Sequence, residues 1–314
     1  MSKSSLPDGT LEQRQSLSLE SKVALANRRI RQWHGYWNGE TYVAFSGGKD
    51  STVLLHLVRN LYPDVPAVFC DTGLEFPEIR EFVRGMDQVT WLRPAMTFRE
   101  IIDVHGWPVA SKRVAKAVRV VRENAPGTEV SRRLYLEGID GRGNPCPHWK
   151  IPKRWLQLLD APFLVGEKCC DVMKKVPSRQ YEKETGRKCF IGTMVEDSWL
   201  RRRNYLQSGC NAFSGSRPVS HPLAVWSQED IWDYISQHNL PYSSVYDMGY
   251  HNTGCIYCAF GAHREKEPNR FQLLRETHPA LWRYCMKDLG LQDVLEYIGV
   301  PSGDELTLLS TATR

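Results

Sequence analysis

The sequence predicts an α/β fold with a doubly wound, mostly parallel sheet. Three short apolar runs with strand character, at 42–45, 67–70 and 89–94, are each followed by a segment with helical spacing of its apolar residues. A fourth run, at 189–192, returns to strand character after a long intervening stretch. Strands and helices that alternate with short connections favour a parallel sheet with helices on both faces.

The composition is that of an ordinary globular protein. Of the 314 residues, 25% are charged and 41% are hydrophobic, and the formal net charge is +5. No run of 18 or more apolar residues occurs, and the first ten residues are polar. We therefore expect a cytoplasmic protein with no membrane partner. Nine cysteines in such a chain indicate metal binding or reactive thiols rather than a disulfide framework.

The chain divides into three predicted parts. Residues 1–39 form an N-terminal helical arm, in which 1–17 are expected to be frayed. Residues 40–260 form the sheet domain, with 106–167 as a basic insertion, and 261–314 form a helical extension.

The insertion contains a predicted helix, 111–124, with regularly spaced basic residues. One interpretation is a solvated helix face, and the other is a patch for the phosphates of a nucleotide or nucleic acid. The residues concerned are Lys112, Arg113, Lys116, Arg119 and Arg122.

The segment Ser46, Gly47, Gly48, Lys49, Asp50 and Ser51 joins the first strand to a helix. Two glycines permit a tight turn with exposed amides, and the helix N-terminus adds unpaired N–H donors and a positive dipole end. Such a nest suits an anion, most naturally a phosphate chain. The alternative is an ordinary connection that happens to contain two glycines.

Asp71 stands at the carboxyl end of the second predicted strand, where open parallel sheets place ligands. A carboxylate at this position can meet a ribose hydroxyl, a metal or an adenine amine. Its alternative role is to cap the following helix.

Two pairs of cysteines, Cys169 with Cys170 and Cys255 with Cys258, are separated by a long stretch of chain. A single Cys-x-x-Cys is a redox pair or half of a zinc site. Four thiolates in two pairs suit a tetrahedral metal or an iron–sulfur cluster. On this chemistry alone, zinc is slightly favoured over an iron–sulfur cluster.

These motifs together resemble the PP-loop ATP pyrophosphatases and the phosphoadenosine phosphosulfate reductase-like family. The loop matches the pattern S-G-G-x-D-S at every fixed position, and residues 71–78 are similar to the D-T-G-x-x-F-P-E block of sulfonucleotide reductases. The cysteine pattern is similar to that of adenylylsulfate reductases, and residues 196–201 resemble the family's E-S-x-x-R. The likeness covers roughly residues 40–260.

The resemblance implies a set of ligands and ligand-binding residues. ATP would place its phosphates on residues 46–51, with Mg²⁺ supported by Asp50 and Asp71, and Thr72 would lie in the same nucleotide site. Arg201 would hold a nucleotide phosphate. The four cysteines would bind a [4Fe-4S] cluster, with Zn²⁺ as the alternative.

Two departures from the reductases favour ATP chemistry. Reductases carry a nucleophilic cysteine in a block like E-C-G-L-H near the C-terminus, and residues 303–314 contain none. Reductases also bind a nucleotide without its pyrophosphate, and their loops drift from the pattern, whereas this loop is intact.

We therefore expect an enzyme that adenylates an acceptor and releases pyrophosphate for cluster-assisted sulfur transfer. Lys49 and Asp50 would be catalytic, and Cys210 would be a sulfur-carrying thiol or a structural cysteine. A sulfur donor such as a cysteine desulfurase would be a partner, and a nucleic acid would contact the insertion. The alternatives are a reductase releasing sulfite, and a non-catalytic nucleic-acid-binding module with a four-cysteine zinc site.

Overall fold

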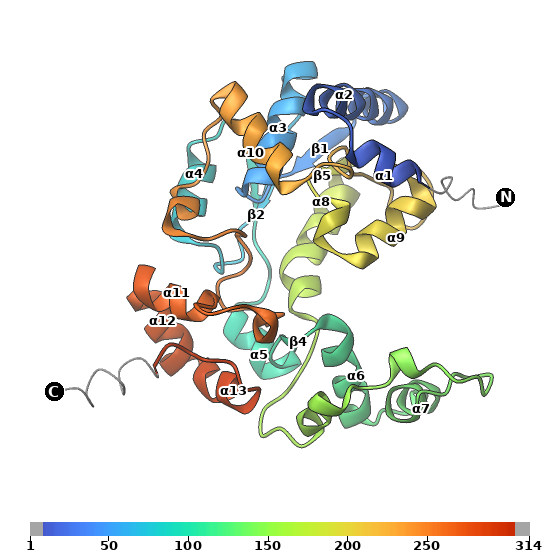
Figure 1. The fold of residues 1–314 in the computed structure, drawn as a ribbon, viewed down its shortest axis with the longest axis vertical. Coiled ribbons are helices and arrows are strands. Elements are labelled where there is room, and N and C mark those ends of the chain that lie inside the picture. Colours follow the sequence, from blue (N-terminus) through green and yellow to red (C-terminus); the bar gives the residue numbers. More distant parts are fainter. Residues whose placement is uncertain (1–8, 305–314) are drawn as a thin grey trace. The chain divides into compact units, whose positions relative to one another are not determined.

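The computed structural model describes residues 9–304, which form two compact units. The sheet unit comprises residues up to 71, 75–93 and 176–253, and the cysteine unit comprises 72–74, 94–175 and residues from 254 on (Figure 1). Every helix and strand lies within one unit. The predicted domain boundaries at residues 40 and 260 stay a prediction.

The sheet unit contains a six-stranded sheet with the order β3-β2-β1-β5-β7-β6. All neighbouring strands are parallel except β6, which is antiparallel to β7. The doubly wound, mostly parallel fold is therefore confirmed. The strands are β1 (Thr41–Ala44), β2 (Ala67–Cys70), β3 (Val89–Leu92), β5 (Lys188–Ile191), β6 (Asn211–Ala212) and β7 (Val219–Ser220).

The strand order reverses beside β1. From β1 the chain builds β2 and then β3 on one side, and it later returns to add β5 on the other. The register pairs Thr41 with Lys188 and Ala44 with Ile191, so β1 and β5 end at the same level. In parallel sheets the ends of two strands at such a reversal form the usual place for a ligand.

Helices of the sheet unit include α2, α3 and α10, which pack together. Trp33 of α2 is fully buried and faces the ring of Phe190 in β5 at 6.5 Å between centroids. A capping box formed by Ser227 and Asp230 begins α10. The helices are α1 (Thr10–Gln15), α2 (Leu19–Tyr36), α3 (Lys49–Leu61), α4 (Pro77–Arg84), α8 (Val176–Thr185), α9 (Trp199–Ser208) and α10 (Gln228–His238), with short helices at Val195–Asp197 and Ser244–Met248.

The first described residues differ from the expectation of a frayed segment. Residues 10–15 form α1, and Leu11 within it is fully buried. Arg14 donates to the hydroxyl of Tyr205 in α9 at 2.7 Å. One apolar side chain and one long-range polar contact therefore hold a segment whose composition is otherwise polar.

The cysteine unit is mainly helical. Its two-stranded parallel sheet, in which Val109 pairs with Ala259, has no counterpart among the predicted strands. Within the segment 261–314, for which helices are predicted, α12 is followed by a π-helical turn. The elements are α5 (Phe98–His105), β4 (Val109–Ala110), α6 (Lys112–Glu123), α7 (Glu129–Glu137), β8 (Ala259–Phe260), α11 (Arg270–Thr277), α12 (Pro279–Arg283) and α13 (Leu291–Tyr297), with short helices at Pro147–Trp149, Lys153–Leu159, Asp171–Lys175, Ala262–Arg264 and Tyr284–Asp288.

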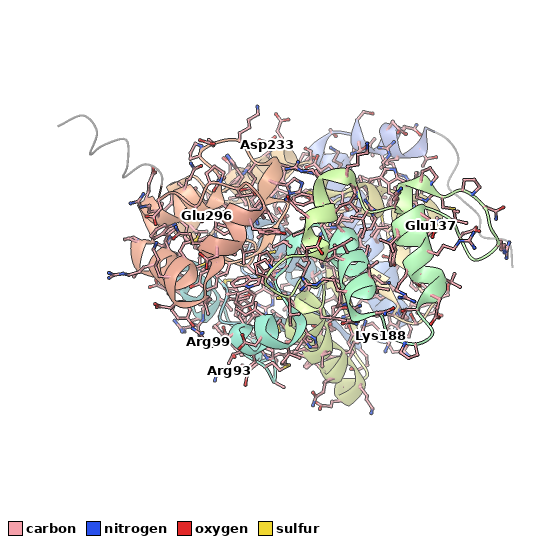
Figure 2. The ribbon with its side chains drawn as sticks, turned by 90° about the horizontal axis from the view of Figure 1, so that it is seen from below. Arg93, Arg99, Glu137, Lys188, Asp233 and Glu296 are labelled. Atoms are coloured by element: carbon pink, nitrogen blue, oxygen red, sulfur yellow. The ribbon has the colours of Figure 1, made fainter. Side chains whose placement is uncertain are left out.

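Charged side chains lie at the surface of both units. Figure 2 shows Glu137 and Glu296 of the cysteine unit and Asp233 of the sheet unit, and all three are exposed. Within residues 9–304, no helix has the length and apolar character needed to cross a membrane.

Candidate functional site

The turn between β1 and α3 is closed by its own hydroxyl groups. Gly48 precedes α3 with extended backbone, and the helix begins at Lys49. The hydroxyl of Ser51 donates to the carbonyl of Gly48 at 2.8 Å and lies 3.1 Å from the hydroxyl of Ser46. The predicted strand, glycine turn and helix start are thus all observed at residues 46–51.

Both glycines of the turn are required by close packing. A Cβ on Gly47 would lie 2.7 Å from Val83 Cγ2 and 2.9 Å from Ile79 Cγ2 of α4, and its φ of +72° disfavours other residues. A Cβ on Gly48 would lie 2.7 Å from the hydroxyl oxygen of Thr253. The turn is therefore enclosed by α4 on one side and by the segment ending at Thr253 on another.

A third glycine supports the first turn of α3 from β5. A Cβ on Gly192 would lie 2.9 Å from the carbonyl oxygen of Asp50 and 3.2 Å from the amide nitrogen of Ser51. The segment that leaves β5 therefore runs directly against the start of α3. In the sequence, Gly192 is recognisable only as the end of a strand, because no local signal marks this long-range approach.

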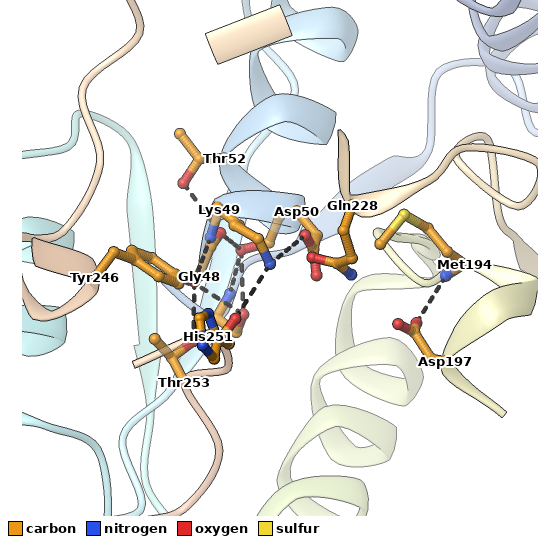
Figure 3. Close-up of polar contacts among 12 residues, drawn as sticks. Gly48, Lys49, Asp50, Thr52, Met194, Asp197, Gln228, Tyr246, His251 and Thr253 are labelled. Carbon is orange, nitrogen blue, oxygen red and sulfur yellow. Dashed lines mark hydrogen bonds and ion pairs between the residues drawn. The ribbon is translucent and has the colours of Figure 1, made fainter. Parts of the chain in front are cut away.

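The two charged residues that begin α3, Lys49 and Asp50, form an ion pair but differ in their other polar contacts. Lys49 is 2% exposed, and its Nζ lies 3.2 Å from Asp50 Oδ1 and 3.5 Å from the carbonyl oxygen of His251 (Figure 3). Asp50 Oδ1 is buried and has no hydrogen bond within the described residues. Burial raises the pKa of the Asp50 carboxyl, although Lys49 acts in the opposite direction.

Tyr246 is a residue of this site that the sequence analysis missed. The backbone N–H of Lys49 donates to the Tyr246 hydroxyl at 2.8 Å, and the Lys49 ammonium lies 5.5 Å from the centre of the Tyr246 ring. The Gly48 N–H donates to the Ser46 hydroxyl at 3.4 Å. Side-chain oxygens therefore already bond the amides of Gly48 and Lys49, within the segment expected to hold phosphate.

Asp71 lies at the end of β2, as predicted, and is 6% exposed. Its Oδ2 accepts a hydrogen bond from Arg80 Nη2 at 2.9 Å, so its charge is compensated by a residue of α4. Thr72 belongs to the cysteine unit, where its hydroxyl accepts from the Leu74 N–H at 3.2 Å. Their nucleotide-binding roles stay predictions.

Arg201 lies in the first turn of α9 and pairs with Asp197. Asp197 also accepts the N–H of Met194 at 3.0 Å (Figure 3). The charges of Asp197 and Arg201 both influence the pKa of Asp50, so the three groups are neighbours. Arg201 is therefore near the loop, and its phosphate contact stays a prediction.

A half-buried histidine, His221, contacts the residue that follows Gly192. The His221 ring nitrogen Nδ1 is 2.8 Å from the hydroxyl oxygen of Thr193. Burial, followed by the nearby charge of Arg201, lowers the pKa of His221 to about 4. The ring is therefore neutral at neutral pH, and no sequence motif marks it.

All four cysteines of the predicted metal set belong to the cysteine unit. Cys169 and Cys170 directly precede the π-helical turn Asp171–Lys175, and Cys258 directly precedes β8. The Cys258 N–H donates to the Cys255 carbonyl at 3.1 Å, which makes Cys255–Cys258 a tight turn. Arg270 donates to the Cys258 carbonyl at 3.0 Å.

The four thiols are close enough to influence one another. The pKa of Cys169 is raised mainly by burial and further by the neighbouring thiols of Cys255, Cys170 and Cys258. The pKa of Cys258 is raised to about 11, again mainly by burial and next by Cys255. A shared cation would relieve the repulsion between four thiolates, so the donor set fits a four-thiolate metal group. Within residues 9–304, no group of three or more His, Cys, Asp or Glu side chains is arranged so that it could hold a metal ion, and the four-cysteine site stays a prediction.

Two further cysteines are buried thiols. Cys210 is 3% exposed and Cys285 is fully buried, and burial raises the pKa of both. Cys285 lies in the short helix Tyr284–Asp288. For Cys210 this burial favours the structural alternative, and its sulfur-carrying role stays a prediction.

The basic helix of the insertion, α6, uses most of its arginines within the fold. Arg119 forms two hydrogen bonds with Glu167, at 2.8 and 2.9 Å, and Arg122 donates to the carbonyls of Phe163 and Ala161. Arg113 donates to the Trp149 and Lys150 carbonyls, whereas Lys112 and Lys116 are exposed. These arginines hold the following segment against α6, so the sequence pattern overstated the free positive charge.

The chain was compared with known families and proteins. The family model for the phosphoadenosine phosphosulfate reductase domain matches residues 40–121 and 146–260, which is more than half of the chain. The unmatched stretch lies inside the predicted insertion 106–167.

Curated relatives have low identity but long alignments. An adenosine 5'-phosphosulfate reductase of Anoxybacillus flavithermus is 23% identical over 264 residues, covering 82% of this chain and 88% of the relative. One from Geobacillus kaustophilus is 28% identical, covering 71% and 74%. An uncharacterized protein of Methanocaldococcus jannaschii is 23% identical over 84% of this chain, which spans 52% of that relative's length.

Solved structures show weaker likeness. The phosphoadenylyl-sulfate reductase of Candida auris aligns with a TM-score of 0.42 and 17% identity, covering 81% of this chain and 98% of its own. The U34-tRNA thiolase NcsA of Methanococcus maripaludis, with its [4Fe-4S] cluster, has a TM-score of 0.37 and 16% identity, covering 88% and 80%. From the extent of the family match, the chain belongs to the phosphoadenosine phosphosulfate reductase domain family.

Proposed function

We propose that the chain binds ATP on residues 46–51 and transfers its adenylyl group to an acceptor oxygen, which prepares the acceptor for sulfur transfer. The observation that carries the proposal is the intact turn at the strand-order reversal, where the N-terminus of α3, Lys49 and Asp50 meet. A helix N-terminus beside a buried ammonium group is suited to a phosphate chain.

The proposed reaction forms one bond to the α-phosphorus and breaks another. The acceptor oxygen attacks that phosphorus while its bond to the bridging oxygen of pyrophosphate breaks, and the negative charge collects on the leaving pyrophosphate. Lys49 is held between Asp50 and the His251 carbonyl, so its charge is positioned before the reaction. Positioned positive groups at the developing charge account for most catalysis of this kind.

Asp50 has the chemistry expected of a Mg²⁺ support. Its buried Oδ1 lacks a hydrogen bond within the described residues, and Mg²⁺ in nucleotide sites takes one or two carboxylates together with phosphate oxygens and water. Bound Mg²⁺ would neutralise phosphate charge. Each of the two carboxylates already has a cation beside it, Lys49 at 3.2 Å from Asp50 and Arg80 at 2.9 Å from Asp71, so Mg²⁺ would share either carboxylate with that cation.

The four cysteines would hold a [4Fe-4S] cluster or Zn²⁺. Their neighbouring thiols fit either group, and a cluster would supply a binding site for sulfide. A sulfur donor protein such as a cysteine desulfurase, and an acceptor that is a nucleotide or nucleic acid, belong to this proposal.

The second candidate is a reductase that releases sulfite from adenylylsulfate or its 3'-phosphorylated form. The names of relatives that align over most of their length support it. Against it stands Cys285, the described cysteine nearest the C-terminus, which is fully buried with a raised pKa. Such a thiol is a poor nucleophile.

The test is ATP turnover by anaerobically purified protein with Mg²⁺, with AMP and pyrophosphate measured together. We expect Asp50→Asn to lower turnover at least about tenfold, because it removes a charge from the site. The matched control is Asp233→Asn, which changes an exposed carboxylate of α10 in the same unit and should leave turnover unchanged.

Two further measurements separate the alternatives. Failure of the wild-type protein to form AMP and pyrophosphate with water, nucleotides or nucleic acids, together with thiol-dependent sulfite release from adenylylsulfate, would establish the reductase. Zinc without iron or acid-labile sulfide, in a protein inactive in both assays, would favour the non-catalytic nucleic-acid-binding module.

A further inference from the structure

The first turn of α9 presents an exposed aromatic ring with an arginine over it. Trp199 is 71% exposed and Leu200 is 53% exposed, which is unusual for large apolar side chains. The guanidinium carbon of Arg203 lies 5.3 Å from the centre of the Trp199 ring. An indole that is held by a cation yet open to solvent is a platform for another flat ring.

The charge around this ring is positive. α9 contains three consecutive arginines and no carboxylate. Arg201 pairs with Asp197 and Arg202 pairs with Glu12, whereas Arg203 has no ion-pair partner among residues 9–304. The unpaired cation is therefore the one beside the exposed ring, which suits a phosphate-bearing ligand.

Trp199 lies between Asp197 and Arg201, two residues whose charges both influence Asp50 of the candidate nucleotide loop. Gly192 packs against the backbone of Asp50, and the chain then runs through Asp197 into α9 within the sheet unit. A ligand on Trp199 would therefore bind within the sheet unit, on the helix that follows Asp197, without occupying residues 46–51.

We propose that Trp199 and Arg203 form a stacking platform for a base of a single-stranded nucleic acid, which is the acceptor class of the function proposed above. The role of the bound nucleic acid as acceptor rests on the proposed function, whereas its binding to Trp199 and Arg203 can be measured independently of that function. The adenine of ATP is a poorer occupant, because small-ligand sites bury most of the ligand and this ring is open. Single strands offer unpaired bases and phosphates together.

The test measures anisotropy of fluorescein-labelled single-stranded DNA, single-stranded RNA and duplex DNA with the full-length protein at fixed salt. Base stacking on an aromatic ring predicts that Trp199→Ala weakens single-strand binding about 5-fold to 150-fold, whereas Trp199→Phe retains most of it. Arg203→Gln should weaken binding and reduce its dependence on salt. Because Trp199 is exposed, unchanged melting temperatures should confirm that the variants fold.

The matched control is Trp149→Ala, which removes a 40% exposed tryptophan from the basic insertion of the cysteine unit. We expect it to leave single-strand binding unchanged. The proposal is overturned if Trp149→Ala weakens binding while Trp199→Ala does not, if duplex binds as tightly as single strands, or if Trp199→Ala weakens ATP binding instead.

Failure of this inference and failure of the proposed function give different results. A protein that forms no pyrophosphate but loses single-strand binding on Trp199→Ala retains the platform and loses the ATP reaction. A protein that forms AMP and pyrophosphate but whose single-strand binding is insensitive to Trp199 retains the reaction and loses the platform.

Discussion

Replacing Tyr246 with phenylalanine removes a single oxygen atom from the candidate nucleotide loop. That oxygen accepts the Lys49 N–H at 2.8 Å and lies 3.4 Å from the Thr253 hydroxyl. Burial raises the pKa of Tyr246, so its hydroxyl is neutral in any ordinary assay. If phosphate takes the same N–H, the hydroxyl competes with it, and Tyr246→Phe should strengthen binding of ATP and pyrophosphate.

The size of the effect follows from one hydrogen bond. A neutral hydrogen bond contributes about 0.5–1.5 kcal/mol net, and about 1.4 kcal/mol is a tenfold change in affinity. We therefore expect the Kd for pyrophosphate with Mg²⁺ to fall about 2-fold to 10-fold. The unliganded variant should lose about 1 kcal/mol of stability, because the Lys49 N–H no longer has its partner.

Isothermal titration calorimetry with pyrophosphate and a non-hydrolysable ATP analogue measures the affinities, and urea unfolding measures the stability. Tyr242→Phe is the matched control, because its hydroxyl bonds the exposed Asp247 and not the loop. Weaker or unchanged pyrophosphate binding by Tyr246→Phe would refute competition and would show that the hydroxyl supports the ligand or lies outside its site.

Three further changes test the structure at single residues. Gly47→Ala should destabilise the protein by about 1–3 kcal/mol and abolish ATP binding, because Gly47 has a positive φ and an added Cβ would collide with Val83. Gly35→Ala is the control, because a Cβ there meets no atom within 4 Å, and it should leave both stability and ATP binding unchanged. Thermal melting measures the stability and calorimetry measures the binding. Arg122→Met should lower the free energy of unfolding, measured in urea, by about 2–5 kcal/mol, because it removes the hydrogen bonds from a charged guanidinium to backbone carbonyls. Lys116→Met is the control at an exposed position of the same helix and should change that free energy by less than about 0.5 kcal/mol. The pKa of His221 is lowered to about 4 from 6.5, so the ring stays neutral in the folded protein at a pH where the unfolded chain takes up a proton. The free energy of unfolding should therefore fall by up to about 1.4 kcal/mol per pH unit as the pH drops from 6.5 towards 4. His221→Gln should flatten this slope, and equal slopes for the variant and the wild-type protein would contradict a neutral ring in the folded state.

The sheet and the loop could be predicted from sequence because their signals are local. β2 coincides with the predicted run 67–70, and α2 lies within residues 1–39, for which helix is predicted. The capping box at Ser227 is likewise a pattern of four consecutive residues. Each depends on periodicity or on a turn residue rather than on a distant partner.

The missing parts of the site depend on contacts over long stretches of chain. Tyr246 reaches the Lys49 amide from 197 residues away, and Gly192 approaches Asp50 from the end of another strand. The basic helix α6 shows the same limit, because its periodicity cannot tell a solvated arginine from Arg122 bonded to carbonyls. A single sequence contains no signal for such partners.

The burial and the pKa values of the cysteines help to distinguish between the two candidate activities. Of the nine, four would be committed to a metal group, and Cys189, Cys210 and Cys285 are buried with raised pKa values. Reduction of a sulfonucleotide needs an attacking thiolate, which then has to come from Cys70, Cys146 or a separate thiol. Adenylyl transfer needs none, because its charged groups are the helix N-terminus, Lys49 and Asp50, and these already lie together at the end of β1.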